Sequence, residues 1–531
     1  MEFFLERKGI MRIVIVGGGT AGWLAALIAS SRFGDRHEIT VIESTKIGII
    51  GVGESTTGWL TEIITNQSWD YGCNLFDFIV ETGATLKYGT KHKGWTKNIE
   101  DYYYAPLDGS IDAFQSPDMM MAFGLGKLRD KEFISLTRYG YLIKNNKSTY
   151  NKEIDSFHYN TEALGALHVD AQLVGKYFKK ISSKNQNVKH IDSEVKEVCL
   201  GENGFITHLE MVNGTVIEGD FFIDCTGLAK VLMKKLPNEW VSYRNNLPVN
   251  TAMPFQLDYL KNEMPEPFTT AWAQSSGWMW QTPLMDRKGN GYVFDDHFIT
   301  PDQAQEEIEV RLGRKIKPIK VIKFEAGRYE SAWVKNCLAV GLSAAFLEPL
   351  EATSIHSTIV QCKNFFFEFL KPTLKETVNE SSIKLYNKRT QRMYDTFRDF
   401  LVMHYTGGRD DSEFWKYINT GATQTDFVKD IIKTAEDRLP TADDFSNFYG
   451  TAGWPLWAFI MNGVGRLNKD KALKEIDFYI KDRGPLENIT ASRYYELQDK
   501  WMKENKDNLY YDDFIKYFRK IREENSFNTQ V

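Results

Sequence analysis

RIVIVGGGTAGWLAALIAS, residues 12–30, has the pattern of a strand, a glycine-rich turn and a helix in succession. Ile13 to Val16 form a β-branched run typical of a buried parallel strand. Gly17, Gly19 and Gly22 follow in G-x-G-x-x-G register. In that register the first glycine permits a tight turn, the second lets backbone approach a pyrophosphate, and the third lets the helix pack closely on the strand. The stretch therefore predicts a dinucleotide-binding unit.

The residues after the glycines support this interpretation. A helix starting near Thr20 and Ala21 would present its N-terminus to the phosphates. Glu43 ends the next apolar run, ITVIE, at a distance where an acidic side chain can accept from a ribose hydroxyl. The alternative is a signal peptide or a short membrane span, because residues 13–31 carry no charge. Three successive glycines would break such an apolar helix, and Glu43 would have no role in it.

Length and composition narrow the class of protein. A chain of 531 residues is long for one domain, so two or three structural regions are expected. A net charge of -6 gives no basic field for nucleic acid or acidic membranes, and neither is expected as a partner. The 5 cysteines show no metal-binding spacing, which favours a reducing cytoplasm, with no disulfides and no metal. The 13 tryptophans allow a substrate cavity walled by flat rings.

The rest of the chain predicts an α/β fold whose Rossmann-type core is revisited twice. FFIDCTG at 221–227 and Cys337 to Val340 are the strands expected to return to the central sheet. Residues 240–320 have strand spacing and suit a sheet over the cofactor, and residues beyond about 370 are expected to be largely helical. Other expected elements are helices over 59–92 and Ala166 to Phe178, the latter with His168 and Asp170 near its start for capping and packing, a hairpin from 193–198 and 207–212, and a buried helix face at 365–369.

Several further positions could carry chemistry. Thr353 and Ser354 stand before an apolar helix pattern and are expected to cap it, and the same helix start can bind an anion. Glu348 and Glu351 flank Pro349 and could serve as bases, although lone loop carboxylates are usually solvated. IGIIGVGESTT, residues 47–57, is a second glycine-rich turn, either a close approach to a flat ligand or simply a tight loop.

Six motifs together resemble the flavin-dependent halogenases of the tryptophan halogenase family. They run in family order from about residue 11 to beyond residue 415, and the W-x-W-x-x-P element is close to diagnostic. The motifs are GGGTAGW at 17–23, GVGEST at 51–56, ATLKYG at 84–89, WMWQTP at 278–283, AVGLSAAFLEPLEATS at 339–354 and DFLVMHY at 399–405.

The resemblance implies that reduced FAD, O2 and a bound halide yield hypohalous acid, which travels to a separate substrate site. Lys87 matches the essential lysine, which forms a haloamine or holds hypohalous acid by hydrogen bonding. Glu351 matches the paired carboxylate, which would stabilise or deprotonate the cationic ring intermediate. Trp278 and Trp280 match the motif thought to keep substrate away from the flavin.

The remaining site expectations concern the cofactor and the halide. Thr353 and Ser354 match the halide site, where the family usually has Thr-Gly, so the preference among chloride, bromide and iodide is open. The cofactor-binding residues expected are Gly17, Gly19, Thr20, Ala21, Gly22, Glu43, Val52, Gly53, Glu54, Val195, Leu342 and Ile355.

The predicted enzyme is a two-component halogenase of an electron-rich indole or phenol. A separate flavin reductase is expected, because the sequence has no second nucleotide-binding glycine fingerprint, and a homo-oligomer is compatible with it. The alternatives are a single-component flavin monooxygenase that hydroxylates an aromatic substrate and a flavin-binding protein without turnover. The expected regions are an FAD-binding core (11–97, 161–238 and 321–370, the last with the halide site), an inserted substrate-side region (98–160), a mixed β-sheet substrate region (239–320) and a helical C-terminal region (371–531), packed as one body.

Overall fold

The Rossmann-type sheet predicted from the glycine motif is present. The computed structural model describes residues 10–48, 51–107, 117–128, 130–157, 165–445, 453–483 and 486–528, so the inserted region 98–160 lies partly outside it. The central sheet has the order β10 (Val188–Asp192), β2 (Glu38–Glu43), β1 (Arg12–Val16), β14 (Phe221–Asp224), β23 (Cys337–Ala339), β22 (Trp333–Val334).

Both predicted returns to this sheet are confirmed. β1 pairs in parallel with β2 and with β14, and β14 pairs in parallel with β23. Helix α1 (Thr20–Phe33) follows β1, and every side chain or glycine from Gly22 to Ser30 is buried. The helix is enclosed because α6 (Ala171–Ser182) and α8 (Thr353–Asn364) both pack on it. The chain therefore brings the starts of α1 and α8 to the same end of one sheet.

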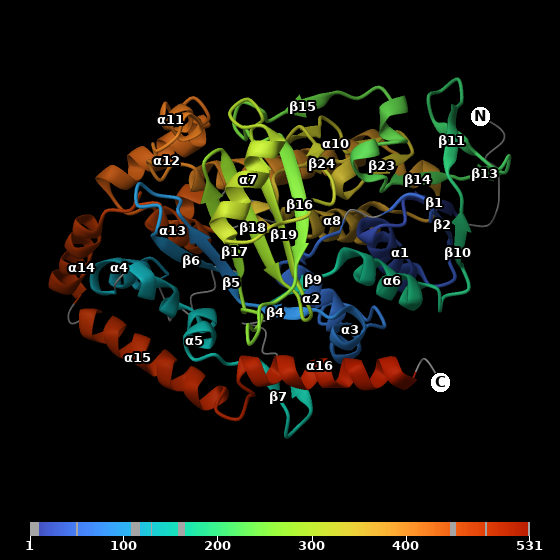
Figure 1. Cartoon of the computed structure of the whole chain (residues 1–531). Helices are drawn as coiled ribbons and strands as arrows, with labels where there is room; N and C mark the ends of the chain where they lie inside the picture. Colours follow the sequence, from blue (N-terminus) through green and yellow to red (C-terminus); the bar gives the residue numbers. More distant parts are fainter. Residues whose placement is uncertain are drawn as a thin grey trace.

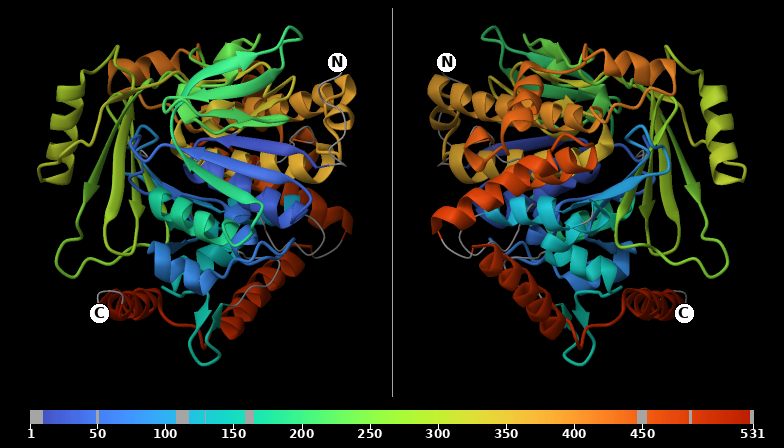
Figure 2. Two further views of the ribbon diagram at one scale, coloured as in Figure 1. Left: turned by 90° about the vertical axis from the view of Figure 1, so that its right-hand side faces the viewer. Right: turned by 90° about the vertical axis from the view of Figure 1, so that its left-hand side faces the viewer.

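A second, mixed sheet is built mainly from the middle of the chain, as the strand spacing predicts. Its order is β20 (Ile322–Lys323), β16 (Thr251–Leu257), β19 (Lys288–Phe294), β18 (Gly277–Pro283), β17 (Thr269–Gln274), β5 (Gly89–Lys93), β6 (Tyr102–Pro106). Helix α7 (Pro301–Leu312) covers its outer face (Figure 2), where Phe255, Tyr292 and Ile308 belong to a separate apolar cluster. The inner face is turned toward the Rossmann-type core.

Residues 59–92 correct the prediction of one helical stretch. Only α2 (Gly58–Ile64) and α3 (Leu75–Thr82) are helical, and α3 ends at Gly83 in the left-handed conformation, φ 65°. The next residues form β4 (Thr85–Lys87) and β5. β4 joins a small antiparallel sheet with β9 (Ala166–Val169) and β3 (Glu54–Ser55). Lys87 therefore lies on a strand between the two larger sheets.

The predicted helix from Ala166 is also shorter than expected. Residues 166–169 are strand β9, which contains His168, and the helix α6 begins afterwards. Asp170 caps α6 as predicted, because its carboxylate accepts from the backbone N–H groups of Gln172 and Leu173. The predicted hairpin is confirmed as β11 (Val195–Leu200) and β12 (Ile206–Met211), extended by β13 (Val216–Glu218). The smaller elements are β7 (Tyr150–Asn151), β8 (Ser156–Phe157), β15 (Trp240–Ser242), β21 (Gly327–Tyr329), β24 (Ala345–Phe346), α4 (Pro117–Lys127) and α5 (Arg138–Lys144).

The C-terminal region is largely helical, as predicted. A π-helical turn at Phe365–Phe369 continues α8 and buries three of its phenylalanines. The later helices are α9 (Leu374–Thr377), α10 (Glu380–His404), α11 (Glu413–Asn419), α12 (Asp426–Asp437), α13 (Trp454–Gly463), α14 (Lys469–Arg483), α15 (Leu486–Glu504) and α16 (Tyr511–Asn528). The last of these, α16, runs along the base of the molecule beside α3 (Figure 1). Among the described residues, no helix has the length and apolar character needed to span a bilayer.

Candidate active site

The loop between β1 and α1 has the geometry that a pyrophosphate requires. Gly17 has φ 113°, and a Cβ there would lie 2.2 Å from the carbonyl oxygen of Cys225. A Cβ on Gly22 would lie 1.8 Å from the carbonyl oxygen of Gly17, so the helix can pack on the turn only with glycine. Gly19 faces open space, and no side chain caps the start of α1. The first-turn amides are thus available to an anion.

Glu43 lies beside this glycine loop, as the sequence pattern predicts. A Cβ on Gly18 would lie 2.3 Å from the Glu43 side chain, so the carboxylate packs directly over the glycines. Its Oε2 is 3.0 Å from both Lys179 Nζ and His190 Nε2. Val195 begins β11, shortly after the strand that pairs with β2 at Glu43. Both contacts use Oε2, and among the described residues no group donates a hydrogen bond to Glu43 Oε1.

The first residues of α1 connect the loop to two neighbouring segments. Thr20 Oγ1 donates to the Ala171 carbonyl at 3.1 Å, which ties α1 to the start of α6. Ala21 packs toward Gly341, where an added Cβ would meet the alanine methyl at 3.2 Å. Leu342 follows within the short 3-10 turn Gly341–Ser343. The expected cofactor residues Thr20, Ala21 and Leu342 therefore surround one end of the central sheet.

The second glycine-rich turn approaches the mixed sheet very closely. A Cβ on Gly289 would lie 1.9 Å from the Val52 carbonyl oxygen and 2.8 Å from the Cα of Gly53. Glu54 follows in β3, and burial raises the pKa of its carboxyl to about 7, with the charge of Asp170 adding to the shift. Val52 and Gly53 therefore make a backbone-to-backbone contact with the mixed sheet.

The start of α8 differs from the predicted cap by one residue. The N-cap is Ala352, in the left-handed conformation with φ 54°, and Thr353 and Ser354 are the first helical residues. An alanine has no side-chain oxygen, so the first-turn amides have no side-chain cap. Thr353 and Ile355 are buried, whereas Ser354 is exposed. The arrangement keeps uncapped N–H groups and the positive end of the helix dipole at an open surface, which suits a small anion.

Lys87 is buried, with a relative exposure of 5%. Its Nζ donates to the Thr56 carbonyl at 3.1 Å, and it interacts electrostatically with Glu351, His92 and His168. Burial lowers the pKa of Lys87 to about 8, against the opposing influence of the Glu351 carboxylate. An ammonium with a pKa this close to neutrality can both donate a hydrogen bond and give up its proton.

Glu351 is held by two buried histidines. His404 Nε2 lies 2.9 Å from Glu351 Oε1, and His92 Nε2 lies 3.4 Å from the same oxygen. Burial alone would raise the pKa of Glu351, but the contacts with His404 and His92 outweigh it and hold the pKa well below the usual range. The Glu351 carboxylate is therefore ionised at neutral pH. Lys87 and Glu351 approach from β4 and from the Pro349–Glu351 turn, elements that are distant in sequence.

The neighbouring carboxylate, Glu348, has different partners. Its Oε2 accepts from Trp278 Nε1 at 2.7 Å and from the Tyr405 hydroxyl at 2.5 Å. Burial raises the pKa of Glu348 to about 7. Tyr405 directly follows His404, so Glu348 and Glu351 contact consecutive residues at the end of α10. Glu348 is thus a structural partner of Trp278 and is not solvated.

Trp278 and Trp280 both lie on β18, with ring centroids 6.4 Å apart. Trp278 is fully buried and packs toward Trp95, at 6.3 Å. Trp280 is opposite Gly291 on β19, where a Cβ would lie 2.0 Å from the indole ring. Gly291 therefore makes the space that the Trp280 ring occupies. The paired indoles form a rigid wall on the inner face of the mixed sheet.

Sequence reasoning missed His92 altogether and gave His404 no role. His404 belongs to the DFLVMHY motif, so the motif contained a signal, whereas His92 is one of many polar residues in a stretch predicted to be helical. The ligand atoms of His92, Glu351 and His404 all lie within 4.8 Å of one another, a spacing that a metal ion could also use. The charge of Lys87 in the same pocket disfavours a cation there.

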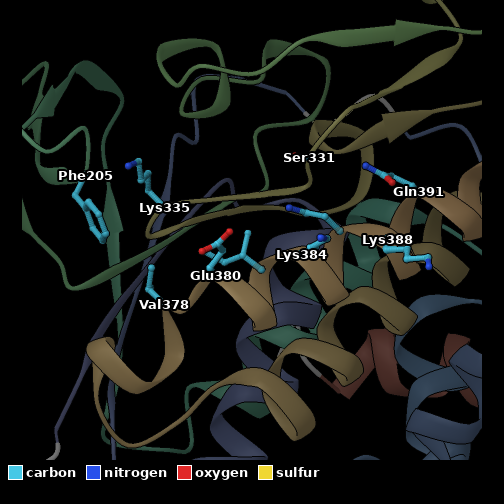
Figure 3. Close-up of a pocket in the computed structure, with 10 residues that line it drawn as sticks. Phe205, Ser331, Lys335, Val378, Glu380, Lys384, Lys388 and Gln391 are labelled. Atoms are coloured by element: carbon cyan, nitrogen blue, oxygen red, sulfur yellow. The ribbon is translucent and has the colours of Figure 1, made fainter.

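A surface pocket of about 750 Å³ lies apart from these residues (Figure 3). Phe205, Lys335, Glu380 and Lys384 line it, and they come from the β12 region, the β22–β23 turn and the start of α10. It contains neither Lys87 nor Glu351 nor any expected cofactor residue, so it is separate from the candidate active site.

A Rossmann-type sheet with an open glycine loop, together with a buried lysine that interacts with a carboxylate and a pair of tryptophans on the mixed sheet, is what a flavin-dependent halogenase, an oxidoreductase, presents. The tryptophan halogenase family model matches residues 12–475, and the chain belongs to that family. The family implies FAD, and the open amides of the β1–α1 loop fit its pyrophosphate.

Three comparisons place the chain among solved and curated proteins. It is 31% identical to the tryptophan 6-halogenase of Streptomyces toxytricini over 533 aligned residues, covering 91% of this chain and 97% of that protein. It is 29% identical to the tryptophan 7-halogenase of Lentzea aerocolonigenes, covering 84% and 86%. A tryptophan C-6 flavin-dependent halogenase (chlorinase) from taromycin biosynthesis superposes with a TM-score of 0.85 at 28% identity, covering 96% of this chain and 100% of that one. These relatives support FADH2-dependent halogenation of an aromatic compound as the family activity.

Proposed function

We propose that this protein is the halogenating component of a two-component, FADH2- and O2-dependent system that delivers electrophilic halogen to an electron-rich indole or phenol through Lys87. The observation that carries the proposal is that the buried Lys87 interacts electrostatically with Glu351, whose Oε1 lies 2.9 Å from His404 Nε2. Such a pair is unusual in a structural core, because burying an ammonium is costly even beside an opposite charge.

The protein supplies binding and electrostatics for this chemistry. Reduced FAD, when bound, would supply the electrons with which O2 converts halide to hypohalous acid. Gly17, Gly19 and Gly22 would receive its pyrophosphate, and Val52, Gly53 and Glu54 would approach its ring. The uncapped amides of Thr353 and Ser354 would hold chloride, bromide or iodide.

Halogen transfer then depends on the enclosed pair. The Lys87 ammonium donates a hydrogen bond to the oxygen of hypohalous acid, which makes the halogen more electrophilic. As the carbon–halogen bond forms and the halogen–oxygen bond breaks, the leaving hydroxide takes a proton from Lys87 and departs as water, and the neutral amine can then accept the proton lost from the ring. The ionised Glu351 stabilises the positive charge that develops on the aromatic ring. Trp278 and Trp280 separate this ring from the cofactor, so that oxygen transfer does not compete. A separate flavin reductase would provide the reduced cofactor.

The test is product mass. The purified protein is incubated with FAD, a flavin reductase, each halide in turn and a panel of indoles and phenols. With bromide, a bromine isotope doublet on an aromatic product is expected. A product heavier by one oxygen would instead favour an aromatic monooxygenase. No product with any halide, although FAD binds and is reduced, would favour a flavin-binding protein without turnover.

A further inference from the structure

His404 is placed between two hydrogen-bond acceptors. Its Nδ1 lies 2.9 Å from the Phe400 carbonyl oxygen and its Nε2 lies 2.9 Å from Glu351 Oε1. A carbonyl oxygen can only accept, so Nδ1 must carry a hydrogen. An ionised carboxylate can also only accept, so Nε2 must carry one as well. A neutral imidazole has a single N–H and would leave two acceptors facing each other.

A neutral pair, with the proton on Glu351, is disfavoured by the surroundings of that carboxylate. His92 Nε2 lies 3.4 Å from the same Oε1, and the Lys87 charge acts on Glu351 from β4. Each of these groups favours an anion at Glu351. Exchanging the ring atoms of His404 by a flip would place carbon atoms against both acceptors and lose both contacts.

The other charged and titratable groups around His404 come from several elements. His92 on β5 has its ring centroid 5.0 Å away, and burial lowers the pKa of His92 to about 4, so it stays neutral. Glu348 acts on His404 from the Pro349 turn. Arg466, after α13, donates to the carbonyl of Thr406, beyond the end of α10. Trp95 and Phe400 close the remaining sides with edge-on rings.

We propose that His404 is a positioning residue: a buried imidazolium that keeps Glu351 ionised and fixes its orientation, so that Glu351 meets the substrate as an anion and stabilises the cationic ring. Both histidine contacts use Oε1, and among the described residues Oε2 accepts from no other side chain or backbone group. The orientation therefore leaves Oε2 for the substrate. The role of Glu351 toward the substrate deepens the proposed function and rests on it. The protonation of His404 does not depend on the proposed function.

The first test is independent of turnover. The full-length protein is labelled with ¹⁵N-histidine, and the ring nitrogens of its 9 histidines are observed by NMR at pH 7 to 8. The His404→Gln variant assigns the His404 signals, and His208→Gln, on β12, is the matched control. We expect both ring nitrogens of His404 to be protonated in the wild type and one of them to lose its proton in Glu351→Gln. A single proton on His404 in the wild type would overturn the proposal.

The second test uses the pH dependence of halogenation. Without His404, the largest influence that offsets the burial of Glu351 is lost and the pKa of Glu351 rises, so activity should be lost as pH falls through that higher value. We expect the acidic limb of the kcat profile of His404→Gln to move up by roughly one pH unit or more, and that of His92→Gln to move less. A lower kcat with an unmoved acidic limb would mean that His404 only packs.

Metal analysis excludes the remaining explanation. A divalent cation bound between His92, Glu351 and His404 would also remove the conflict, because His404 Nε2 could then bind the metal without carrying a hydrogen toward Glu351. Stoichiometric metal in the purified wild type that is absent from His404→Gln would overturn the proposal, and a metal content unaffected by that substitution supports it. If the aromatic panel gives no halogenated product while the NMR result holds, the proposed function fails and the imidazolium assignment stands.

Discussion

At the scale of single residues, burial of the Lys87 ammonium in the candidate site lowers the stability of the folded protein. Lys87 is buried, its pKa is lowered to about 8, and among the described residues its ammonium donates one hydrogen bond, to the Thr56 carbonyl. An amine in that setting is poorly solvated and weakly compensated, which destabilises the folded state but makes the N–H groups strong donors. A catalytic role explains why a destabilising lysine stands at this position, whereas a role in packing alone does not.

Replacing Lys87 by methionine should therefore stabilise the protein. The pKa is about 8 in the folded state and near 10.5 in the unfolded chain, so the full cost is present below pH 8. It corresponds to about 1–3 kcal/mol. Between pH 8 and 10.5 the unfolded chain binds more protons, so wild-type stability rises and the advantage of Lys87→Met shrinks. Urea unfolding midpoints of the wild type and of Lys87→Met at pH 7 and pH 10 measure the stability difference and its dependence on pH. Equal midpoints at pH 7 would show that the ammonium costs nothing there.

Glu351 should be the most sensitive carboxylate of the site. In Glu351→Gln the side chain keeps its shape and loses its charge, so the cation on the substrate ring loses its counterion. The rate of halogen transfer should fall by about 10²–10⁴-fold. Single-turnover formation of halogenated product, with FAD binding measured in parallel, gives the rate. An unchanged rate would leave Glu351 with a purely structural role.

At the scale of elements, the anion site depends on how α8 begins. Ala352 adopts a left-handed conformation and supplies no capping oxygen, so no side chain of the described residues caps the first turn, which includes the amides of Thr353 and Ser354. Sequence reasoning placed the cap one residue too late, because Thr and Ser are the preferred capping residues and alanine is not. The prediction of a Thr or Ser cap therefore hid the absence of a side-chain cap, which is the feature that suits an anion.

Ser354→Gly should change halide selectivity. The substitution removes a Cβ and a hydroxyl next to the uncapped amides, on an exposed residue where little packing is lost. The relative yields of chlorinated, brominated and iodinated product, measured in competition, should shift from those of the wild type. Identical ratios would mean that Ser354 does not contact the halide.

The sequence predicted the Rossmann-type core well and the site only in pieces. β1, β14 and β23 were found because buried parallel strands are β-branched, apolar and followed by glycine. β4 was not, because three residues are too few to show an alternation and the preceding helical pattern runs into them. His92 was missed for the same reason. The pairing of Lys87 with Glu351 came from resemblance, since contacts between such distant segments leave no local pattern.

At the scale of the whole molecule, the C-terminal helix supports the strand that carries Lys87. Tyr511 is fully buried at the start of α16, and its hydroxyl donates to the Leu86 carbonyl at 2.9 Å. Farther along α16, Arg519 donates to the Met285 carbonyl in the loop after β18. The helix thus bridges β4 and the mixed sheet from below (Figure 1).

Tyr511→Phe should weaken that support. The substitution keeps the ring and leaves the Leu86 carbonyl without this partner, which should destabilise the protein by about 1–3 kcal/mol. Halogenation should fall as well, because the neighbouring Lys87 loses its fixed backbone. Phe518→Leu, deeper in the same helix face, is a control for general loss of packing. If Tyr511→Phe loses stability but keeps full activity, α16 has no part in positioning Lys87.

The central claim is that halogen reaches the substrate through Lys87, and the most direct measurement is the mass of the product made by Lys87→Ala. Wild type and variant are compared with reduced FAD, O2, bromide and an accepted aromatic substrate, after equal FAD binding has been shown. The account predicts a bromine isotope doublet for the wild type and unmodified substrate for Lys87→Ala, with FADH2 oxidised at the same rate in both. Brominated product from Lys87→Ala at the wild-type yield would contradict it.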